Sequence, residues 1–393
     1  MSFGVFPLLP ENLKGLPVIL LLLASVYCIV TSGFKRFNVY TFLILSSLFI
    51  INILSLLNTF DFPNRKVETM LSLLLVPLAF LLINRKVNRS ELKEFSIVFI
   101  SSSVLLSISH MVYYYSIGLF SEESLRVNSF RKAVVDIPML SDHPIYVSMF
   151  LAVSILLIPN IFKRVNSKVK VFFILGIIFC VIDLFLISSK GVVVSLFLSF
   201  TVYVLLMLKG SRKRFKFIVA LGFIATFFIA IFYLPTLERR FRELYRKTTY
   251  TKIQHHNSSS IRIGVYQCVL KTISEKPVFG YGLGSNALRE CYSELSDHLY
   301  KKDYNSHNQF LGYFLNAGAF GFLTLVGFLF YNFKIAVRKS DSTYISILIF
   351  FSIVMLTENI LERQSGIILF IFIVCTFYFL DKQKSPYNLQ DSA

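Results

Sequence analysis

The sequence predicts an all-α, polytopic integral membrane protein that crosses the bilayer about eleven times. Three observations lead to this fold class. Of the 393 residues, 55% are hydrophobic and only 16% are charged, with a mean hydropathy of +0.66. The apolar residues fall in runs of roughly 17 to 23, the length that a helix needs to cross about 30 Å of hydrocarbon. These runs are continuous and lack the alternation of barrel strands, so helices are expected.

Each apolar run is expected to form one membrane-spanning helix, although about ten to twelve helices would also fit the pattern. The first run is followed directly by further spans, with no small-residue cleavage pattern after it, so it is expected to be a retained helix and not a signal peptide. The expected spans are residues 17–32, 38–57, 67–83, 95–117, 144–162, 170–187, 191–208, 216–234, 309–331, 343–361 and 365–380.

Basic residues in the short loops indicate the orientation, because such loops favour the cytoplasmic side. The segments Lys163–Lys170 and Lys209–Lys216 are basic and contain no acid. Both are therefore expected in the cytoplasm, and the turn at Ser188–Lys190 between them is expected on the outer side. Counting from these loops leaves the N-terminus outside and the C-terminus inside.

Two long connections then fall on the outer side, and the larger one suggests a division into three parts. These are a helix bundle over residues 1–234, a large outer loop domain over 235–308, and C-terminal helices with a cytoplasmic tail over 309–393. The smaller outer connection covers residues 118–143.

The large loop is strongly basic near its start, at Arg239, Arg240 and Arg242. These cations fit a solvated surface, a contact with anionic lipid headgroups, or a site for a polyanionic ligand whose phosphate oxygens match the arginine fork. The net charge of +18 does not indicate nucleic acid, because the cytoplasmic loops account for a share of it. The loop also contains Cys268 and Cys291; an oxidising compartment would allow a disulfide, but the sequence leaves the pairing open.

Several common catalytic classes are not indicated. The sequence has no GxSxG elbow, no HExxH helix, no Walker loop and no CxxC pair. No two of the six histidines have the context of a metal site, and no metal or other cofactor is expected. The glycine-rich tract Gly280–Gly284 lacks the strand context of a dinucleotide fold, and a tight turn that allows close backbone approach is the expected role.

The stretch SHNQFLGYFLNAGAFG, residues 306–321, resembles the signature of the O-antigen ligase and polymerase family. That signature is a histidine followed by Asn, Ser or Gln, then nine residues, a glycine, and a second small residue three positions on. It reads here as His307, Asn308, Gly318 and Gly321.

Two further tracts extend the resemblance over about residues 180–325. IRIGVYQCVLKTISEKPVFGYGLGSN is similar to the family's outer-loop helix, which opens with an arginine, here Arg262, and ends in a proline and a glycine-rich turn. ISSKGVVVSL stands where family members carry a Ser or Thr and an arginine. Lys190 replaces that arginine, which keeps the charge but loses the bidentate fork.

The resemblance implies a metal-independent glycosyltransferase of the bacterial inner membrane, with its active face in the periplasm. Its implied partners are an undecaprenyl-pyrophosphate-linked glycan as donor, a lipid A-core sugar or a lipid-linked glycan as acceptor, and membrane lipids. A ligase to the lipid A-core is the preferred interpretation, and a repeat-unit polymerase of the same family is the alternative. A transporter of lipid-linked sugars is a more distant alternative. Transporters place polar residues near the bilayer midplane, whereas the spans expected here contain few charges at that depth.

Glycosyl transfer from a pyrophosphate needs cations for the leaving group and a base for the acceptor hydroxyl. His307 is the expected base, and Arg262 and Lys190 are the expected pyrophosphate ligands. Their ordinary alternatives are an interfacial histidine, a surface ion pair and a snorkelling lysine. Glu358 and Arg363 are expected to pair and hold the pocket. The residues expected to contact substrate are Arg239, Arg240, Arg242, Asn308, Gly282, Gly284, Glu358 and Arg363.

Overall fold

The computed structural model describes residues 2–33, 37–59, 64–121, 129–162, 166–208, 210–233, 235–244, 253–254 and 257–381. Every element in this part of the chain is a helix, apart from one β-bridge between Val87 and Leu380. The prediction of an all-α fold is therefore confirmed. Lys163, Arg164 and Lys209 of the two basic loops lie outside the described residues.

The helices of the first half of the chain are η1 (Ser2–Leu8), η2 (Glu11–Leu13), α1 (Leu16–Ser32), α2 (Val39–Leu45), α3 (Ser47–Ser55), η3 (Leu56–Asn58), α4 (Asn64–Met70), α5 (Ser72–Ile83), α6 (Arg89–Ser116), α8 (Ser129–Asp136), α9 (Pro144–Leu157), α10 (Pro159–Phe162) and α11 (Ser167–Ile187). The second half contains α12 (Lys190–Met207), α13 (Lys213–Tyr233), α14 (Pro235–Arg242), α16 (Ser258–Glu275), α17 (Arg289–Leu295), α18 (Asp297–Lys302), α19 (Gln309–Arg338), α20 (Ser342–Met355) and α21 (Gln364–Tyr378).

Within the described residues, eight helices are long and apolar enough to cross a membrane. The α2 and α3–η3 helices, bent by 65° at their junction, make a ninth if they form one span. The count by length and composition is thus eight or nine instead of eleven. The two remaining apolar runs form α20 and α21, with 14 and 15 residues. At about 1.5 Å per residue, each is shorter than the roughly 30 Å of hydrocarbon.

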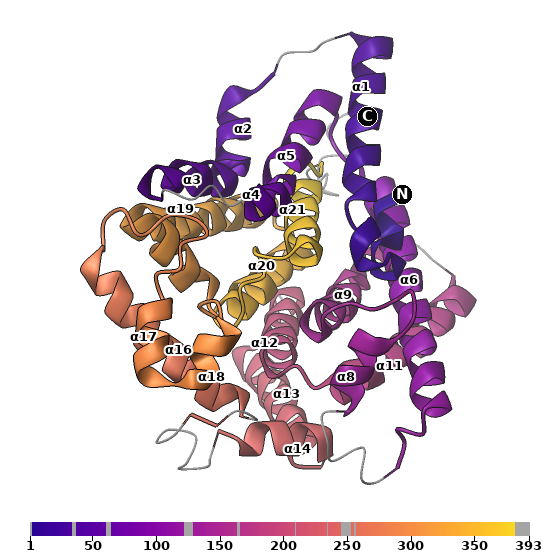
Figure 1. The fold of residues 1–393 in the computed structure, drawn as a ribbon. Coiled ribbons are helices and arrows are strands. Elements are labelled where there is room, and N and C mark those ends of the chain that lie inside the picture. Colours follow the sequence, from indigo (N-terminus) through magenta and orange to yellow (C-terminus); the bar gives the residue numbers. More distant parts are fainter. Residues whose placement is uncertain are drawn as a thin grey trace.

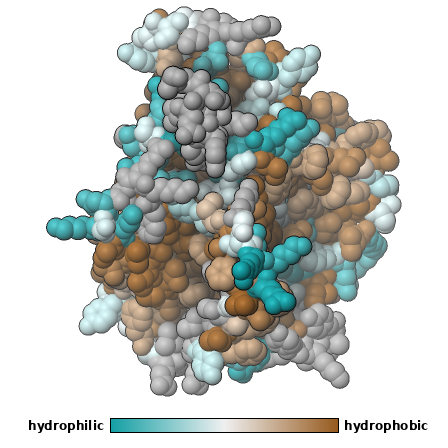
Figure 2. Space-filling model, turned by 180° about the vertical axis from the view of Figure 1, so that it is seen from behind, coloured by the Kyte–Doolittle hydropathy of each residue, from teal (hydrophilic) through white to brown (hydrophobic). Residues whose placement is uncertain are grey.

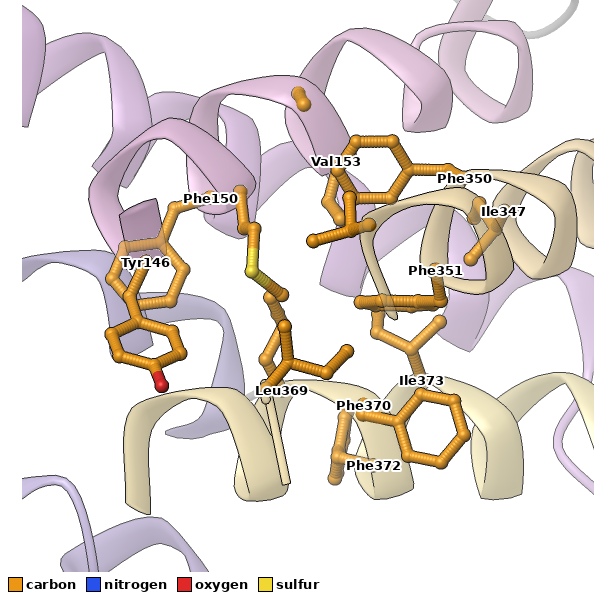
Figure 3. Close-up of a cluster of buried hydrophobic side chains, with 14 of the residues drawn as sticks. Tyr146, Phe150, Val153, Ile347, Phe350, Phe351, Leu369, Phe370, Phe372 and Ile373 are labelled. Atoms are coloured by element: carbon orange, nitrogen blue, oxygen red, sulfur yellow. The ribbon is translucent and has the colours of Figure 1, made fainter. Parts of the chain in front are cut away.

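Both short helices lie inside the bundle instead of on its surface (Figure 1). Every residue of α21 from Ser365 to Phe377 is buried. Phenylalanine and aliphatic side chains of α9, α20 and α21 meet there in the main hydrophobic core (Figure 3). Phe351 and Phe370, for example, pack edge to face with their ring centroids 5.2 Å apart. These helices are apolar all round because they are surrounded by protein.

The outer helices of the bundle expose apolar side chains over wide areas (Figure 2). Val30 on α1, Phe172 on α11 and Phe232 on α13 are each about two-thirds exposed or more. A soluble surface rarely carries such large apolar patches, whereas lipid covers them at no cost. The exposed faces and the long helices together describe a multi-pass membrane protein.

The helices α8, α14, α16 and α18 gather at one end of the bundle, in the lower part of Figure 1. We call this the site end. Helices α16 to α18 form a second, smaller core around Val265, Cys268, Tyr292 and Leu299. A disulfide between Cys268 and Cys291 joins α16 to α17, with a Cα–Cα distance of 5.6 Å, which settles the pairing that the sequence left open.

Candidate active site

A cavity of about 240 Å³ opens at the site end of the bundle. Its walls come from α8, the start of α9, the α11–α12 turn, α14, α16, the loop before α19, and the connection between α20 and α21. Its polar lining consists of Arg131, His143, Ser189, Lys190, Arg240, Ser258, Arg262, Tyr304, His307 and Glu358. The three expected catalytic residues, His307, Arg262 and Lys190, thus meet in one cavity although they lie far apart in the sequence.

Glu358 stands between His307 and Arg262. Its carboxylate forms an ion pair with the Arg262 guanidinium, and its Oε2 lies 3.6 Å from Nδ1 of His307. The expected pair between Glu358 and Arg363 is therefore wrong, because Arg262 and His307 occupy the carboxylate. Burial alone would raise the pKa of Glu358. The positive charge of Arg262 and the contacts with His307 and His143 lower it by more, so the pKa of Glu358 lies below its ordinary value. Glu358 is ionised at neutral pH.

Lys190 is the first residue of α12, and its side chain lines the cavity. Its Nζ donates to Oε2 of Glu243 and to Oγ of Ser259, each at 2.9 Å. Arg240 on α14 reaches the other oxygen of Glu243 at 3.4 Å. Burial is the main cause that lowers the pKa of Arg240. One carboxylate therefore holds two cations at the cavity wall, and Arg240 is the arginine of α14 that faces inward.

Arg131, which the sequence analysis missed, is the third arginine of the cavity. One of its Nη atoms donates to Oγ of Ser189 at 2.9 Å and to the carbonyl of Ile187 at 3.4 Å. Burial, followed by the nearby Arg240, lowers its pKa to about 10, so it stays charged at neutral pH. Neither partner is a carboxylate, and no described carboxylate forms an ion pair with this guanidinium, so an anion can bind to it. The only signal in the sequence was a basic residue in the outer connection 118–143.

His143 is a cavity residue that the sequence analysis did not single out. It begins α9 as the N-cap residue, where its Nδ1 accepts from the amide of Ile145 at 3.4 Å. Burial, followed by Arg363 and Arg131, lowers the pKa of His143 to about 4. It is therefore neutral at pH 7 and adds no charge to the cavity. Among the described residues, the four cations Arg131, Lys190, Arg240 and Arg262 and the two carboxylates Glu243 and Glu358 give the site a net charge of +2 when His143 and His307 are neutral.

The loop that carries His307 is fastened to the α20–α21 connection. Asn308 caps α19 by accepting from the amides of Phe310 and Leu311, and its Nδ2 donates to the carbonyl of Leu356 at 3.0 Å. The Gln309 side chain accepts from the amide of Leu361 at 2.7 Å. His307 itself has a φ of +45°, a conformation that a non-glycine residue adopts only when its surroundings hold it. Asn308 thus serves here as a helix cap and a brace.

The glycine-rich tract forms a tight turn against α19, away from the cavity lining. Helix α19 is kinked at Ala317 and Gly318, and the amides of Tyr281 and Gly282 donate to the carbonyls of Leu315 and Asn316 at 2.9 and 2.8 Å. A Cβ on Gly318, whose φ is +60°, would lie 2.1 Å from the carbonyl oxygen of Val278. The glycine of the sequence signature is therefore required by the close approach of this turn.

Six residues expected to contact substrate do not line the cavity, and one of them is Asn308, the helix cap described above. Arg239 and Arg242 are exposed on α14, where Arg242 pairs with Glu238. Arg363 is exposed at the start of α21. The remaining two are Gly282, which is packed against Ser55 and Thr59, and Gly284.

Residues 175–326 match the family model described as O-antigen ligase. The chain contains an O-antigen ligase domain. The resemblance found in the sequence is thereby confirmed. No curated protein matches the chain. The O-antigen ligase domain includes Lys190, Arg240, Arg262 and His307, whereas other parts of the chain supply Arg131, His143 and Glu358 to the same cavity.

Proposed function

We propose that this protein is an O-antigen ligase-type glycosyltransferase of the bacterial inner membrane. It moves a glycan from undecaprenyl pyrophosphate to a sugar of the lipid A-core on the periplasmic face, without a metal. The observation that carries the proposal is the placing of His307, backed by Glu358, in the same cavity as four cations. The O-antigen ligase match supports an enzyme that acts on lipid-linked glycans.

The cations suit the leaving group. A departing lipid pyrophosphate carries about two to three negative charges, and cations that are fixed in place before the reaction stabilise such charge effectively. Arg131 offers a guanidinium with no carboxylate partner among the described residues, while Arg262 and Lys190 are each held in place by one glutamate. The arginine forks match phosphate oxygens in pairs, and Lys190 adds a point charge.

His307 suits the base. Its Nδ1 is buried and faces Glu358, yet the side chain is 23% exposed, so the opposite edge with Nε2 is the part that the cavity reaches. In the proposed step the acceptor hydroxyl oxygen attacks the anomeric carbon, and Nε2 takes the hydroxyl proton. The bond from that carbon to the pyrophosphate oxygen breaks, and its electron pair leaves with the lipid pyrophosphate. Glu358 stabilises the imidazolium that forms.

The test is transfer of a labelled glycan from undecaprenyl pyrophosphate by the purified chain in the presence of EDTA. Lipid A-core is offered as the acceptor in one reaction and a second lipid-linked glycan in another. We expect transfer to lipid A-core, with a loss of roughly 100-fold to 10,000-fold in turnover for His307→Ala. His298→Ala is the matched control, because this histidine lies on α18 outside the cavity lining.

Three results would contradict the proposal. Chain growth only on the lipid-linked acceptor would make the protein a polymerase of the same family. Normal turnover of His307→Ala would show that His307 is not the base. Loss of wild-type transfer in EDTA would show that the reaction needs a metal.

A further inference from the structure

Three buried polar side chains meet in the bundle close to the cavity but outside its lining. They are His110 and Tyr114 of α6 and Asp183 of α11, and each is fully buried. His110 Nδ1 lies 2.7 Å from one oxygen of Asp183, and the Tyr114 hydroxyl donates to the other oxygen at 3.1 Å. We call them the α6–α11 cluster. An ionisable group inside a membrane helix is costly and normally serves a purpose, and the proposed chemistry uses none of these three.

Asp183 of the cluster lies six residues before Ser189, which lines the cavity. Asp183 is on the last turn of α11, which ends at Ile187. Ser188 then adopts a left-handed conformation with a φ of +47°, and the chain turns directly into Ser189 and Lys190. Because Asp183 is tied to α6 through both carboxylate oxygens, the end of α11 cannot rotate or slide without breaking buried hydrogen bonds.

The same cluster also contacts the helix that carries Arg131. Tyr114 packs edge to face against Phe130 of α8, with ring centroids 4.9 Å apart. Phe130 is the neighbour of Arg131 in the chain, and it is 1% exposed. Tyr114 therefore touches both elements whose relative position sets the hydrogen bond between Arg131 and Ser189.

We infer that the α6–α11 cluster is a positioning element for the pyrophosphate end of the cavity. His110, Asp183 and Tyr114 fix α8 against the α11–α12 turn, so that the Arg131 guanidinium and Lys190 are presented in one arrangement. A small displacement of such groups lowers the rate and the affinity strongly, because binding and transfer both require the groups to be held in the correct orientation beforehand. The inference rests on the proposed function for the identity of the ligand.

The first experiment measures binding of undecaprenyl pyrophosphate, without a sugar, to the purified full chain. Asp183→Leu removes both hydrogen bonds, and we expect its affinity to fall roughly 10-fold to 100-fold. Asp183→Asn keeps the shape and one acceptor, and should recover most of that loss. Asn332→Leu is the matched control. It removes another buried hydrogen bond, 2.8 Å from the Tyr344 hydroxyl to Asn332, towards the far end of α19.

Thermal unfolding of the same variants separates positioning from general stability. Asp183→Leu and Asn332→Leu should lower the melting temperature by similar amounts, while only Asp183→Leu weakens binding. Equal effects of the two variants on affinity would overturn the inference. In a double-mutant cycle, Asp183→Leu should cost little more affinity in an Arg131→Ala background, and full additivity of the two changes would also overturn it.

A measurement without ligand keeps the inference testable if the proposed function fails. Hydrogen exchange of residues 129–136 and 187–192 should quicken in Asp183→Leu and stay unchanged in Asn332→Leu. Unchanged exchange in both segments would reject the positioning role. Wild-type protein that binds the lipid pyrophosphate but transfers no glycan would instead reject the proposed function alone.

Discussion

Replacing Glu358 with glutamine tests how the cavity supports a histidine base. The substitution keeps the shape and removes one charge from a carboxylate that is 13% exposed, 3.6 Å from Nδ1 of His307. Because the pKa of Glu358 lies below its ordinary value, the wild-type carboxylate is charged at any pH at which a histidine can act as a base. The variant therefore removes the same charge across the whole working range.

The geometry sets the size of the effect. Unit charges 3.6 Å apart interact by about 4 to 5 kcal/mol at an effective dielectric constant of about 20. Water in the open cavity and the competing charge of Arg262 reduce this value, so about 2 to 4 kcal/mol is expected for the forming imidazolium. That corresponds to a loss of roughly 30-fold to 1,000-fold in the rate of the chemical step. The acceptor affinity should change little, because the imidazolium exists only after proton transfer.

The assay is single-turnover transfer from a labelled lipid-linked glycan, with protein concentration above that of the donor. Glu362→Gln is the matched control on the same connection, since its carboxylate accepts from Asn305 at 2.7 Å and from Asn359 at 2.6 Å, not from His307. It should keep near-normal rates. A Glu358→Gln rate within about threefold of wild type would refute the reasoning, because an effect below about 0.7 kcal/mol is too small for a charge at that distance.

Four other predictions follow from the same structure. Arg262→Ala should lower kcat/KM for transfer by about 30-fold to 1,000-fold, and Arg262→Lys should recover only part of that loss. Wild-type activity in Arg262→Ala would mean that Arg262 serves only as a structural ion-pair partner. Lys190→Arg should be tolerated and Lys190→Ala should not, measured in the same assay at equal protein levels. The folded-state pKa of His143 is about 4, below the ordinary 6.5, so its contribution to stability is complete above about pH 6.5 and is lost as the pH falls towards 4. Melting temperature across this range should therefore fall by less in His143→Asn, which keeps a capping side chain, and an identical slope would contradict the assignment. Reducing the Cys268–Cys291 disulfide should destabilise the helices α16 to α18 by about 3 kcal/mol, seen as faster proteolysis there, with no such change in a Cys268→Ser variant, which lacks the bond from the start.

The sequence predicted the residues of the site that belong to a local motif, and it missed those that depend on distant packing. His307 and Arg262 were found because each stands at a fixed place in a recognisable tract. Glu358 was identified but paired with Arg363, five residues away, whereas its partner Arg262 lies 96 residues away in sequence. No local pattern carries that information. Arg131 gave even less signal, since a single arginine in a long connection has many ordinary roles.

Two other differences have simple physical causes. Neighbouring positions on a helix point in different directions, so Arg239, Arg240 and Arg242 could not all face one cavity, and only Arg240 does. Hydropathy also cannot distinguish a lipid-facing helix from one buried in protein. The runs at 343–361 and 365–380 were therefore counted as spans, although they form short core helices with a polar connection between them.

The shortness of α20 is what makes its connection useful to the site. A helix that crosses the hydrocarbon needs about 20 residues, six or so more than α20 has, and those residues would add about 9 Å. Glu358 comes three residues after the end of α20. Such an extension would carry the carboxylate away from Arg262 and His307, and with it the Asn359 amide that donates to Ser306 at 2.9 Å. Because α20 ends early inside the bundle, the connection after it lies next to the His307 loop. Glu358 on that connection is therefore within reach of both His307 and Arg262.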